Sequence, residues 1–256
     1  MGTLIKQEWY KLAHKNGTWI AIGVMVAIQV FVAVMGRLYP DVALLKPEVT
    51  TIVDYYGGGL VIFIAIANVA STVSMEFQYG TMKQLLYRQY YRSQVFMSKV
   101  IVAICHFVLL QAIASVVTFA LAAGLNGYDW MAVHQGRSNL AAYGLSLAGF
   151  MLMGLMLLSC ALMLSTVLKT NAAAIISGFV GYFVVEIASS ILTALIAKWE
   201  FLKWNPFTFL LVGQQLTSDS VRSLTHLSDP VMIAGSLIYT LVFGLIAYAS
   251  FRKRSI

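Results

Sequence analysis

Long stretches without a charged residue are the feature that most constrains how this chain can fold. Six of them occur along 256 residues; each is at least 21 residues long, and a single acid, Glu186, interrupts the fifth. A helix needs about 20 apolar residues to cross the hydrocarbon core of a bilayer. Barrel strands would be shorter and would alternate between apolar and polar residues. The pattern therefore predicts an all-α membrane protein with six transmembrane helices.

Composition supports the same fold class. Charged residues make up 11% of the chain, against about 25% in soluble globular proteins. The first apolar stretch is followed by Arg37 rather than by a small-residue cleavage site, so it is interpreted as a retained span and not as a signal peptide. We treat residues 1–256 as a single transmembrane domain with spans at 17–37, 54–75, 95–124, 141–168, 171–196 and 231–251. The short connection around Lys169 predicts that the fourth and fifth spans form an antiparallel hairpin.

The distribution of lysine and arginine predicts the orientation of the chain in the membrane. With the N-terminus in the cytoplasm, the inner segments hold eleven of these residues and the outer segments six. Cytoplasmic loops of membrane proteins carry the excess of positive charge. We therefore expect a multi-pass protein of the cell membrane with both termini in the cytoplasm. The net charge of +7 is then a signal of orientation and lipid contact rather than of nucleic-acid binding.

Residues 3–15 precede the first span and have an amphipathic pattern. Ile5, Trp9 and Leu12 follow helical spacing and share one face. Such a helix lies along the membrane surface, with its tryptophan at the level of the lipid headgroups. The alternative is a disordered basic segment that only sets the orientation. The apolar face favours the helix, which would lead into the first span like an elbow.

The segment 197–230 before the last span is too aromatic and apolar for a solvated loop, yet Asn205 and Pro206 interrupt it. Proline removes a backbone donor and breaks a helix. We expect two short, half-inserted helices that re-enter the membrane from the outer side, with Trp199 and Trp204 at the interface. Irregular backbone at membrane depth is tolerated where protein covers it, so this segment should pack against other spans.

The loop between the second and third spans, residues 76–93, has the most ordered pattern of any connection in the chain. Gly80 and Thr81 interrupt the helix that leaves the second span, and Thr81 can cap a new helix. An apolar face follows at Met82, Leu85 and Leu86, and the basic side chains off that face are Lys83, Arg88 and Arg92. At the start of the third span, Lys99 is expected to extend its ammonium group to the inner surface.

This pattern has two interpretations. An interfacial helix that only rests on lipid would show the same apolar and basic sides. However, the chain contains no phosphate-binding loop and no metalloprotease or serine-hydrolase motif. A membrane protein without an energy source but with a prepared cytoplasmic surface points to a soluble motor protein that docks on this loop.

The residues around the loop resemble those of a known transporter family. The pattern Ser74-x-Glu76-x-x-x-Gly80-Thr81, followed by Leu85-Leu86, Arg92 and Lys99, is similar to the loop after the second span in type-2 permeases of ATP-binding-cassette (ABC) exporters. The elbow helix, the six spans and the re-entrant helices before the last span extend the resemblance over the whole chain. Family members often have a proline shortly before the arginine, where this chain has Gln89-Tyr90-Tyr91.

The resemblance implies a subunit without catalysis of its own. In the family this loop carries a coupling helix that sits in a groove of a cytoplasmic ATPase, which binds ATP and Mg; here the helix would occupy about Gly80–Tyr91. The implied ATPase-coupling residues are Glu76, Gly80, Thr81, Lys83, Leu85, Leu86, Arg88 and Arg92. A second permease chain, the same or a sister, would complete the transporter. The implied task is export of an amphiphilic, lipid-like or peptide substrate, and members of this length often give bacteria resistance to antimicrobial peptides such as lantibiotics.

Several polar residues lie inside the predicted spans. Glu186 lies roughly 23 Å from the inner end of its span, and an intramembrane acid normally faces protein or water. It therefore either lines a substrate path or is a hydrogen-bonded packing residue. Gln29 and Gln111 lie at similar depths and would meet across the first and third spans, which favours an amide pair over a substrate contact. Asn205 and Pro206 complete the candidate substrate path.

Two further functions remain open. An intramembrane enzyme would need a paired acid and base, but Glu186 and His106 differ in depth by about half the bilayer. His106 is interpreted as a satisfied packing residue, and Cys105 and Cys160 as apolar ones, without a metal site or a disulfide. A membrane subunit that senses peptides without moving them would have the same loop, so the sequence does not separate it from a permease.

Overall fold

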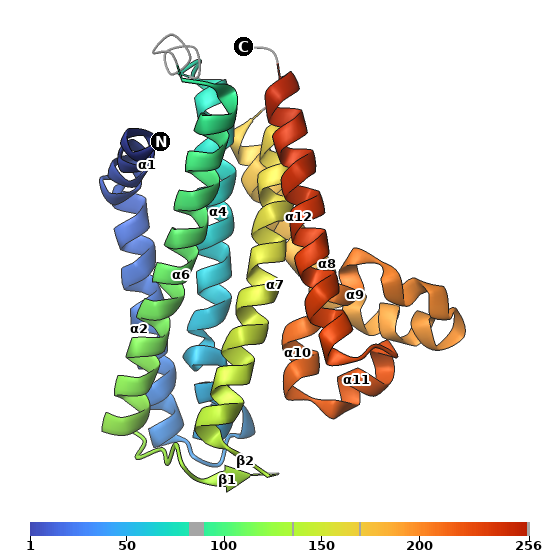
Figure 1. The fold of residues 1–256 in the computed structure, drawn as a ribbon. Coiled ribbons are helices and arrows are strands. Elements are labelled where there is room, and N and C mark those ends of the chain that lie inside the picture. Colours follow the sequence, from blue (N-terminus) through green and yellow to red (C-terminus); the bar gives the residue numbers. More distant parts are fainter. Residues whose placement is uncertain (82–89, 135, 169, 255–256) are drawn as a thin grey trace.

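The structure of this chain, a computed structural model, is a bundle of long helices (Figure 1). It describes residues 1–81, 90–134, 136–168 and 170–254, and leaves out the side chains at 134, 185, 186 and 188–190. Both ends of the described chain lie at one end of the bundle (Figure 1). Residues 81 and 90, which flank the connection between the second and third long helices, lie there too. We call this end the loop end.

Among the described residues, six helices have at least 22 residues. They are α2 (Asn16–Leu38), α4 (Gly57–Gln78), α6 (Arg92–Gly124), α7 (Asn139–Val167), α8 (Asn171–Lys198) and α12 (Asp229–Lys253). Five are long and apolar enough to cross a membrane, where α4 is counted together with the short helix α3 (Pro47–Thr50) that precedes it. In α8, the fully described apolar stretch is Asn171–Val184. An all-α membrane protein is therefore confirmed, and the count of six spans stays a prediction.

Local sequence explains where the helices begin. The side-chain oxygens of Ser138 and Thr170 accept hydrogen bonds from backbone N–H groups in the first turns of α7 and α8, which stabilises both starts. Because α7 ends at Val167 and α8 begins at Asn171, the predicted antiparallel hairpin is confirmed. Helix α6 runs 33 residues without a proline. At 1.5 Å per residue it is about 50 Å long, so it extends beyond a ~30 Å hydrocarbon core.

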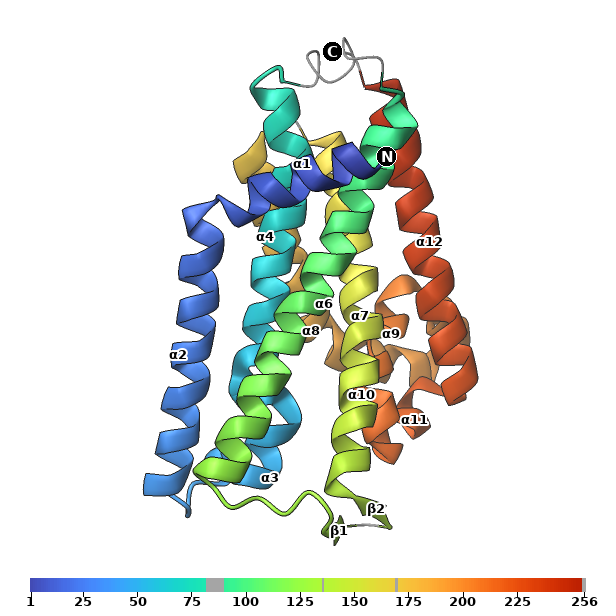
Figure 2. The ribbon, with the colours of Figure 1, turned by 60° about the vertical axis from the view of Figure 1, so that its left-hand side comes forward.

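Helix α1 (Gly2–Ala13) lies crosswise over α4 and α6 at the loop end (Figure 2). Its buried residues are Leu4 and Glu8. The expected apolar face, Ile5, Trp9 and Leu12, lies next to that buried face and is half-buried. The helix itself was predicted, whereas its contact with protein through Leu4 and Glu8 was not. The membrane contact of the apolar face stays a prediction.

At the opposite end, short elements connect the long helices. They are η1 (Ala43–Leu45), η2 (Thr51–Tyr56) and a pair of antiparallel strands, β1 (Val133–His134) and β2 (Arg137–Ser138), in which Val133 pairs with Ser138. These two strands, which the sequence analysis did not predict, are the only β structure in the described ranges. They lie in the connection between α6 and α7, at the edge of the bundle (Figure 1).

The segment before the last span is more divided than predicted. In place of two helices it contains η3 (Glu200–Trp204), α9 (Pro206–Phe209), α10 (Val212–Thr217) and α11 (Asp219–Thr225). Asn205 ends η3 and caps α9, which has Pro206 in its first turn, so the predicted interruption becomes a helix start. The expected packing against other helices is confirmed, because residues 209–212 are buried and the segment lies beside α7 and α12 (Figure 1).

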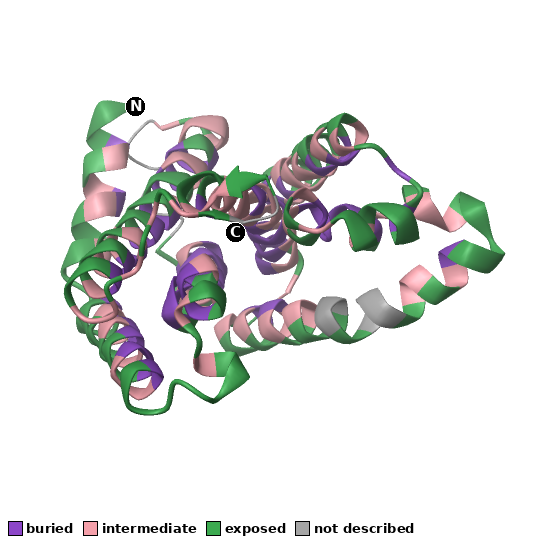
Figure 3. Ribbon diagram, turned by 90° about the horizontal axis from the view of Figure 1, so that it is seen from below, coloured by how far each residue is buried: buried purple, intermediate pink, exposed green. Residues whose placement is uncertain are grey.

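The apolar core lies between α4, α6, α7 and α12. Seen from below, buried residues gather where the helices face one another, and exposed residues cover most of the outward faces (Figure 3). The outward faces of α2, α8 and α12 carry large exposed apolar side chains, among them Trp19, Phe31, Phe183, Ile187 and Leu241. An apolar exterior over a packed interior is the arrangement expected in lipid.

Candidate functional site

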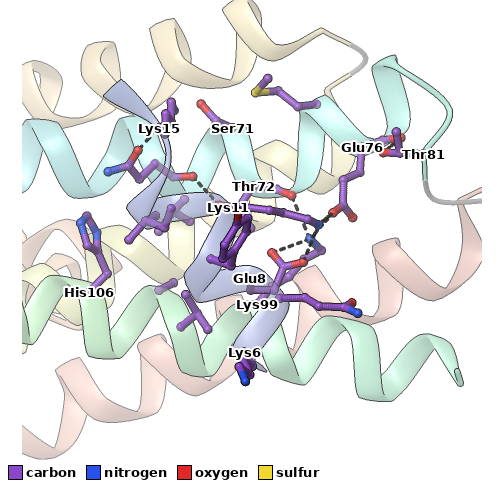
Figure 4. Close-up of a pocket in the computed structure, with 18 of the residues that line it drawn as sticks. Lys6, Glu8, Lys11, Lys15, Ser71, Thr72, Glu76, Thr81, Lys99 and His106 are labelled. Atoms are coloured by element: carbon purple, nitrogen blue, oxygen red, sulfur yellow. Dashed lines mark hydrogen bonds and ion pairs between the residues drawn. The ribbon is translucent and has the colours of Figure 1, made fainter. Parts of the chain in front are cut away.

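Four charged side chains join three helices at the loop end. Glu8 and Lys11 come from α1, Glu76 from α4 and Lys99 from α6. Lys11 Nζ lies 2.9 Å from Glu8 Oε1 and 2.7 Å from Glu76 Oε1, while Lys99 Nζ lies 3.1 Å from Glu8 Oε2 and 2.9 Å from Glu76 Oε1 (Figure 4). We call this set the charge cluster. Two carboxylates and two ammonium groups leave it formally neutral.

Burial and charge act in opposite directions on the part of the cluster that lies on α1. Burial on its own would raise the pKa of the Glu8 carboxyl, but the ammonium groups of Lys99 and Lys11 outweigh it and lower that pKa. Burial on its own would lower the pKa of Lys11, and the carboxylates of Glu76 and Glu8 outweigh it and raise that pKa. Both groups are therefore held in their charged forms, as a docked ion cluster requires.

The cluster corrects one expectation and adds to another. Lys99 does not extend to the surface: its side chain is 0% exposed, and its ammonium group also donates to the backbone oxygen of Thr72. It stays inside because two carboxylates and a carbonyl satisfy it there. Glu76, expected to contact the ATPase, is buried and paired with both lysines. Its contact with an ATPase stays a prediction.

The loop begins as expected. Helix α4 ends at Gln78, and Gly80 has a positive φ of 69°, a conformation that glycine adopts without strain. Thr81 Oγ1 donates to the backbone oxygen of Glu76 at 3.4 Å, so it closes the end of α4. Whether Thr81 also caps a following helix stays a prediction. Four expected coupling residues lie outside the described residues, namely Lys83, Leu85, Leu86 and Arg88.

The far side of the loop is tied to the C-terminal end of the chain. Arg92, the first residue of α6, donates from Nη1 to the backbone oxygens of Arg252 at 2.6 Å and Arg254 at 3.0 Å. Arg254 in turn donates to three carbonyls at the end of α7, those of Ser165, Thr166 and Leu168. Carbonyls at a helix end have no partner within the helix, so these two arginines cap α12 and α7.

A third connection joins α4 to α8. The backbone N–H of Asn171 donates to Gln78 Oε1 at 3.0 Å, and Ser74 Oγ donates to Asn171 Oδ1 at 2.9 Å. Through these bonds and the charge cluster, the residues that flank the loop contact α1, α6, α8 and α12 directly, and α7 through Arg254. The arrangement can pass a displacement of the loop to these helices.

A cleft of about 820 Å³ opens beside the charge cluster, between α1, α4 and α6 (Figure 4). Four lysines line it: Lys6, Lys11, Lys15 and Lys99. His106 lies at its inner end and is buried, and its Nε2 has no hydrogen-bond partner in the described part of the chain. The expectation that His106 is a satisfied packing residue is therefore not met at this nitrogen among the described residues.

At the opposite end, the two glutamines meet around an acid that stands at the start of the second predicted span, 54–75. Asp54 in η2 is 5% exposed. Gln29 donates to its backbone oxygen at 2.9 Å, and Gln111 donates to its Oδ2 at 2.6 Å. Thr118 and Tyr143 donate to its Oδ1. Gln29 and Gln111 therefore come together as expected. They do not bond each other, however, because each amide donates to Asp54.

The other expected substrate-path residues are not brought to this group. Asn205 accepts a hydrogen bond from Thr208 N and donates to the backbone oxygen of Leu202, and Pro206 begins α9, so both have local roles between α8 and α12. Glu186 lies in α8, and its side chain is outside the description. Their contact with a substrate stays a prediction.

Sequence reasoning missed Asp54, Tyr143 and the pairing of Glu8 with lysines. One signal was present: Glu8 and Glu76 are the two acids in segments that otherwise carry only basic charge. Isolated acids in a basic surface near the membrane indicate specific partners. No such signal marked Asp54, because an acid beside a predicted outer loop is an ordinary solvated residue.

Comparison with known proteins agrees with the geometry. A family model described as ABC-2 family transporter protein matches residues 4–185, a range that includes α1, the charge cluster and the loop. Comparison with curated proteins gave no match. Members of the family are typically non-catalytic membrane subunits that associate with an ABC ATPase. Since the match covers more than half of the chain, this protein belongs to the ABC-2 family of transporter proteins.

Proposed function

We propose that this chain is the transmembrane permease subunit of an ABC exporter, driven by a separate cytoplasmic ATPase that docks on residues 76–93. ATP and Mg are bound by that partner, and this chain carries no catalytic residue. The loop end faces the cytoplasm, as the excess of lysine and arginine favours. A second permease chain, the same or a sister, completes the path for an amphiphilic, lipid-like or peptide substrate.

The observation that carries the proposal is the way both flanks of the loop are anchored. On one side, Glu76 is bonded to α1 and α6, and Gln78 to α8. On the other side, Arg92 is bonded to the end of α12. A loop that only connected two spans would not need to contact the other helix ends. A loop on which a partner pushes needs to contact those helix ends, because the displacement must reach the whole bundle.

Closure of the ATPase pair would move this loop as a unit. The charge cluster would carry the displacement to α1, and the Arg92 contact would carry it to α12. Because these contacts are short and charged, they favour movement of packed helices as rigid bodies over local bending. The substrate path would open between the two permease chains, with Glu186, Gln29, Gln111, Asn205 and Pro206 as candidate contacts.

Co-purification with an ABC ATPase from the same cells tests the docking. Wild-type protein is expected to retain the ATPase, and Arg88→Glu or Leu85→Asp to lose it, because one reverses a charge and the other puts a charge on the apolar face. Arg137→Glu, an exposed charge reversal at the opposite end, is the control and should retain the ATPase. Failure of wild-type protein to bind any ATPase would contradict the proposal.

A peptide-sensing subunit remains the second candidate, because the anchored loop serves sensing as well as transport. The two differ in the fate of the peptide. Cells that contain an exporter accumulate less labelled antimicrobial peptide in their membrane when ATP is present. A sensor leaves the amount of bound peptide unchanged.

A further inference from the structure

The cleft beside the charge cluster has the shape and position of a lipid site. Its walls come from residues 68–76 in the second half of α4 and residues 99–106 in the first half of α6. The crosswise helix α1 lies over them at the loop end (Figures 2 and 4). In the proposed orientation the loop end lies at the inner surface of the membrane. At about 820 Å³ the cleft falls within the size range of small-molecule sites.

The charge in the cleft is positive once the internal pairs are subtracted. Lys11 and Lys99 are neutralised by Glu8 and Glu76 in the charge cluster. This leaves two lysines on the rim. Within the described residues, Lys6 has no ion-pair partner, and Lys15 contacts only Asn68 Oδ1, at 3.4 Å. Two ammonium groups without a carboxylate are complementary to an anion such as a phosphate group.

Two buried polar atoms in the wall are also left without a partner. Glu76 Oε2 and His106 Nε2 form no hydrogen bond with any described residue. An unpaired polar group in an apolar setting is costly. A headgroup that carries hydroxyl donors as well as phosphate oxygens would supply partners to both after a small rotation of their side chains.

Most of the remaining surface of the cleft is apolar, although polar side chains such as Ser71 and Thr72 are among its lining residues. The apolar side chains are those of Leu12, Val69, Met75, Val102 and Ala103. A free phosphate ion gains nothing from such walls, whereas the glycerol and upper acyl carbons of a phospholipid do. Unpaired positive charge together with apolar surface in one cleft matches a lipid that carries an anionic headgroup on apolar chains.

We infer that the cleft between α1, α4 and α6 binds an anionic glycerophospholipid of the inner leaflet, with its phosphate held by Lys6 and Lys15. Such a lipid would lie against α1, the helix that the charge cluster holds on α4 and α6. This inference does not depend on the docking of an ATPase, and it holds for the isolated chain.

Lipid titration of the purified full-length chain in neutral detergent tests the site, with bound lipid counted by native mass spectrometry. Phosphatidylglycerol is expected to bind one molecule per chain at this site. Lys6→Gln and Lys15→Gln should each weaken its binding about fivefold, and the double variant roughly 25-fold, since a lysine near a charged membrane surface contributes that much. Lys46→Gln, an exposed lysine at the opposite end, is the control and should bind as the wild type does.

Three results would overturn the inference. The first is equal affinity for phosphatidylcholine and phosphatidylglycerol, which would mean that the lysines do not recognise charge. The second is wild-type affinity in the Lys6→Gln/Lys15→Gln variant. The third is displacement of the lipid by millimolar inorganic phosphate, which would assign the cleft to a soluble anion. Loss of ATPase binding in the loop variants, by contrast, would leave all three readouts unchanged.

Discussion

Glu8, Lys11, Glu76 and Lys99 show how single residues fix the position of α1. Burying charges is expensive, and a buried ion pair often contributes little net stability compared with apolar packing. A buried pair does, however, raise the free energy of every arrangement in which one of its charges is buried without a partner. Helix α1 has a modest buried apolar face, with Leu4 as its buried hydrophobic residue, so the charge cluster specifies where it docks on α4 and α6.

Removal of Lys99 should therefore cost more than removal of a lysine from a surface pair. In Lys99→Met, two buried carboxylates share one lysine, and we expect a loss of about 3 kcal/mol in the free energy of unfolding. Lys203→Met is the control: it breaks the pair with the exposed Glu200, and water screens such a surface pair, so the loss should be much smaller. Denaturant titration of the detergent-solubilised proteins measures both, and equal losses would contradict the role of the cluster.

The same residues predict a pH dependence. The pKa of Glu8 is lowered from its ordinary value of 4.5, so its contribution to stability is fully present above that pH and is lost as the pH falls through the lowered pKa. The pKa of Lys11 is raised from 10.5, so its contribution is lost only as the pH rises above that value. Wild type should thus exceed Glu8→Gln in stability by a constant margin at neutral pH, and the margin should shrink below pH 4.5. A margin that grows on acidification would exclude this origin.

At the scale of elements, the turn before α4 is held in an uncommon conformation. Asp54, Tyr55 and Tyr56 all have positive φ, at 53°, 49° and 64°. Such a backbone costs roughly 1 kcal/mol or more per residue unless its surroundings stabilise it. Here the hydrogen bonds to Asp54 stabilise the turn. Gln29 can approach the backbone oxygen of Asp54 because Gly57 has no side chain.

Two neighbouring glycines test this account of the turn. A Cβ at Gly57 would lie 2.6 Å from Gln29 Cδ, whereas a Cβ at Gly59 would meet nothing within 4 Å. Gly57→Ala should therefore destabilise the protein by about 1–3 kcal/mol through overpacking, while Gly59→Ala should be neutral or stabilising by up to ~1 kcal/mol, since alanine favours a helix. Thermal unfolding in detergent measures both. If the two variants behave alike, the close approach of Gln29 does not fix the turn.

The elements themselves followed from the sequence better than their contacts did. The long apolar helices, the α7–α8 hairpin and a helix before α2 are set by local signals, such as uncharged length, the short connection between Val167 and Asn171 and apolar spacing. The partners of Lys99 and Asp54 include residues 57 to 91 positions away in the chain. A pattern within one segment carries no information on such partners. The division of 197–230 was missed because a capping residue, Asn205, was interpreted as an interruption.

At the scale of the whole molecule, the loop end gathers everything that a docked motor would need to move. Helix α1, the start of α6 and the ends of α7 and α12 all lie there (Figure 1). Each is joined to a residue that flanks the loop by a hydrogen bond or ion pair, directly or through Arg254. The opposite end lacks such convergence among the described residues: Asp54 joins η2 to α2, α6 and α7 but not to α8 or α12.

Site-specific photocrosslinking in the membrane tests most directly which end receives the ATPase. A photoreactive residue at position 83, in the loop, should form a covalent product with the ATPase, and one at position 46, at the opposite end, should not. The account also predicts that Lys99→Met weakens the effect of ATP on the position of α1 without abolishing the product at 83. A product at position 46, or its absence at 83 in cells that contain both proteins, would contradict the central claim.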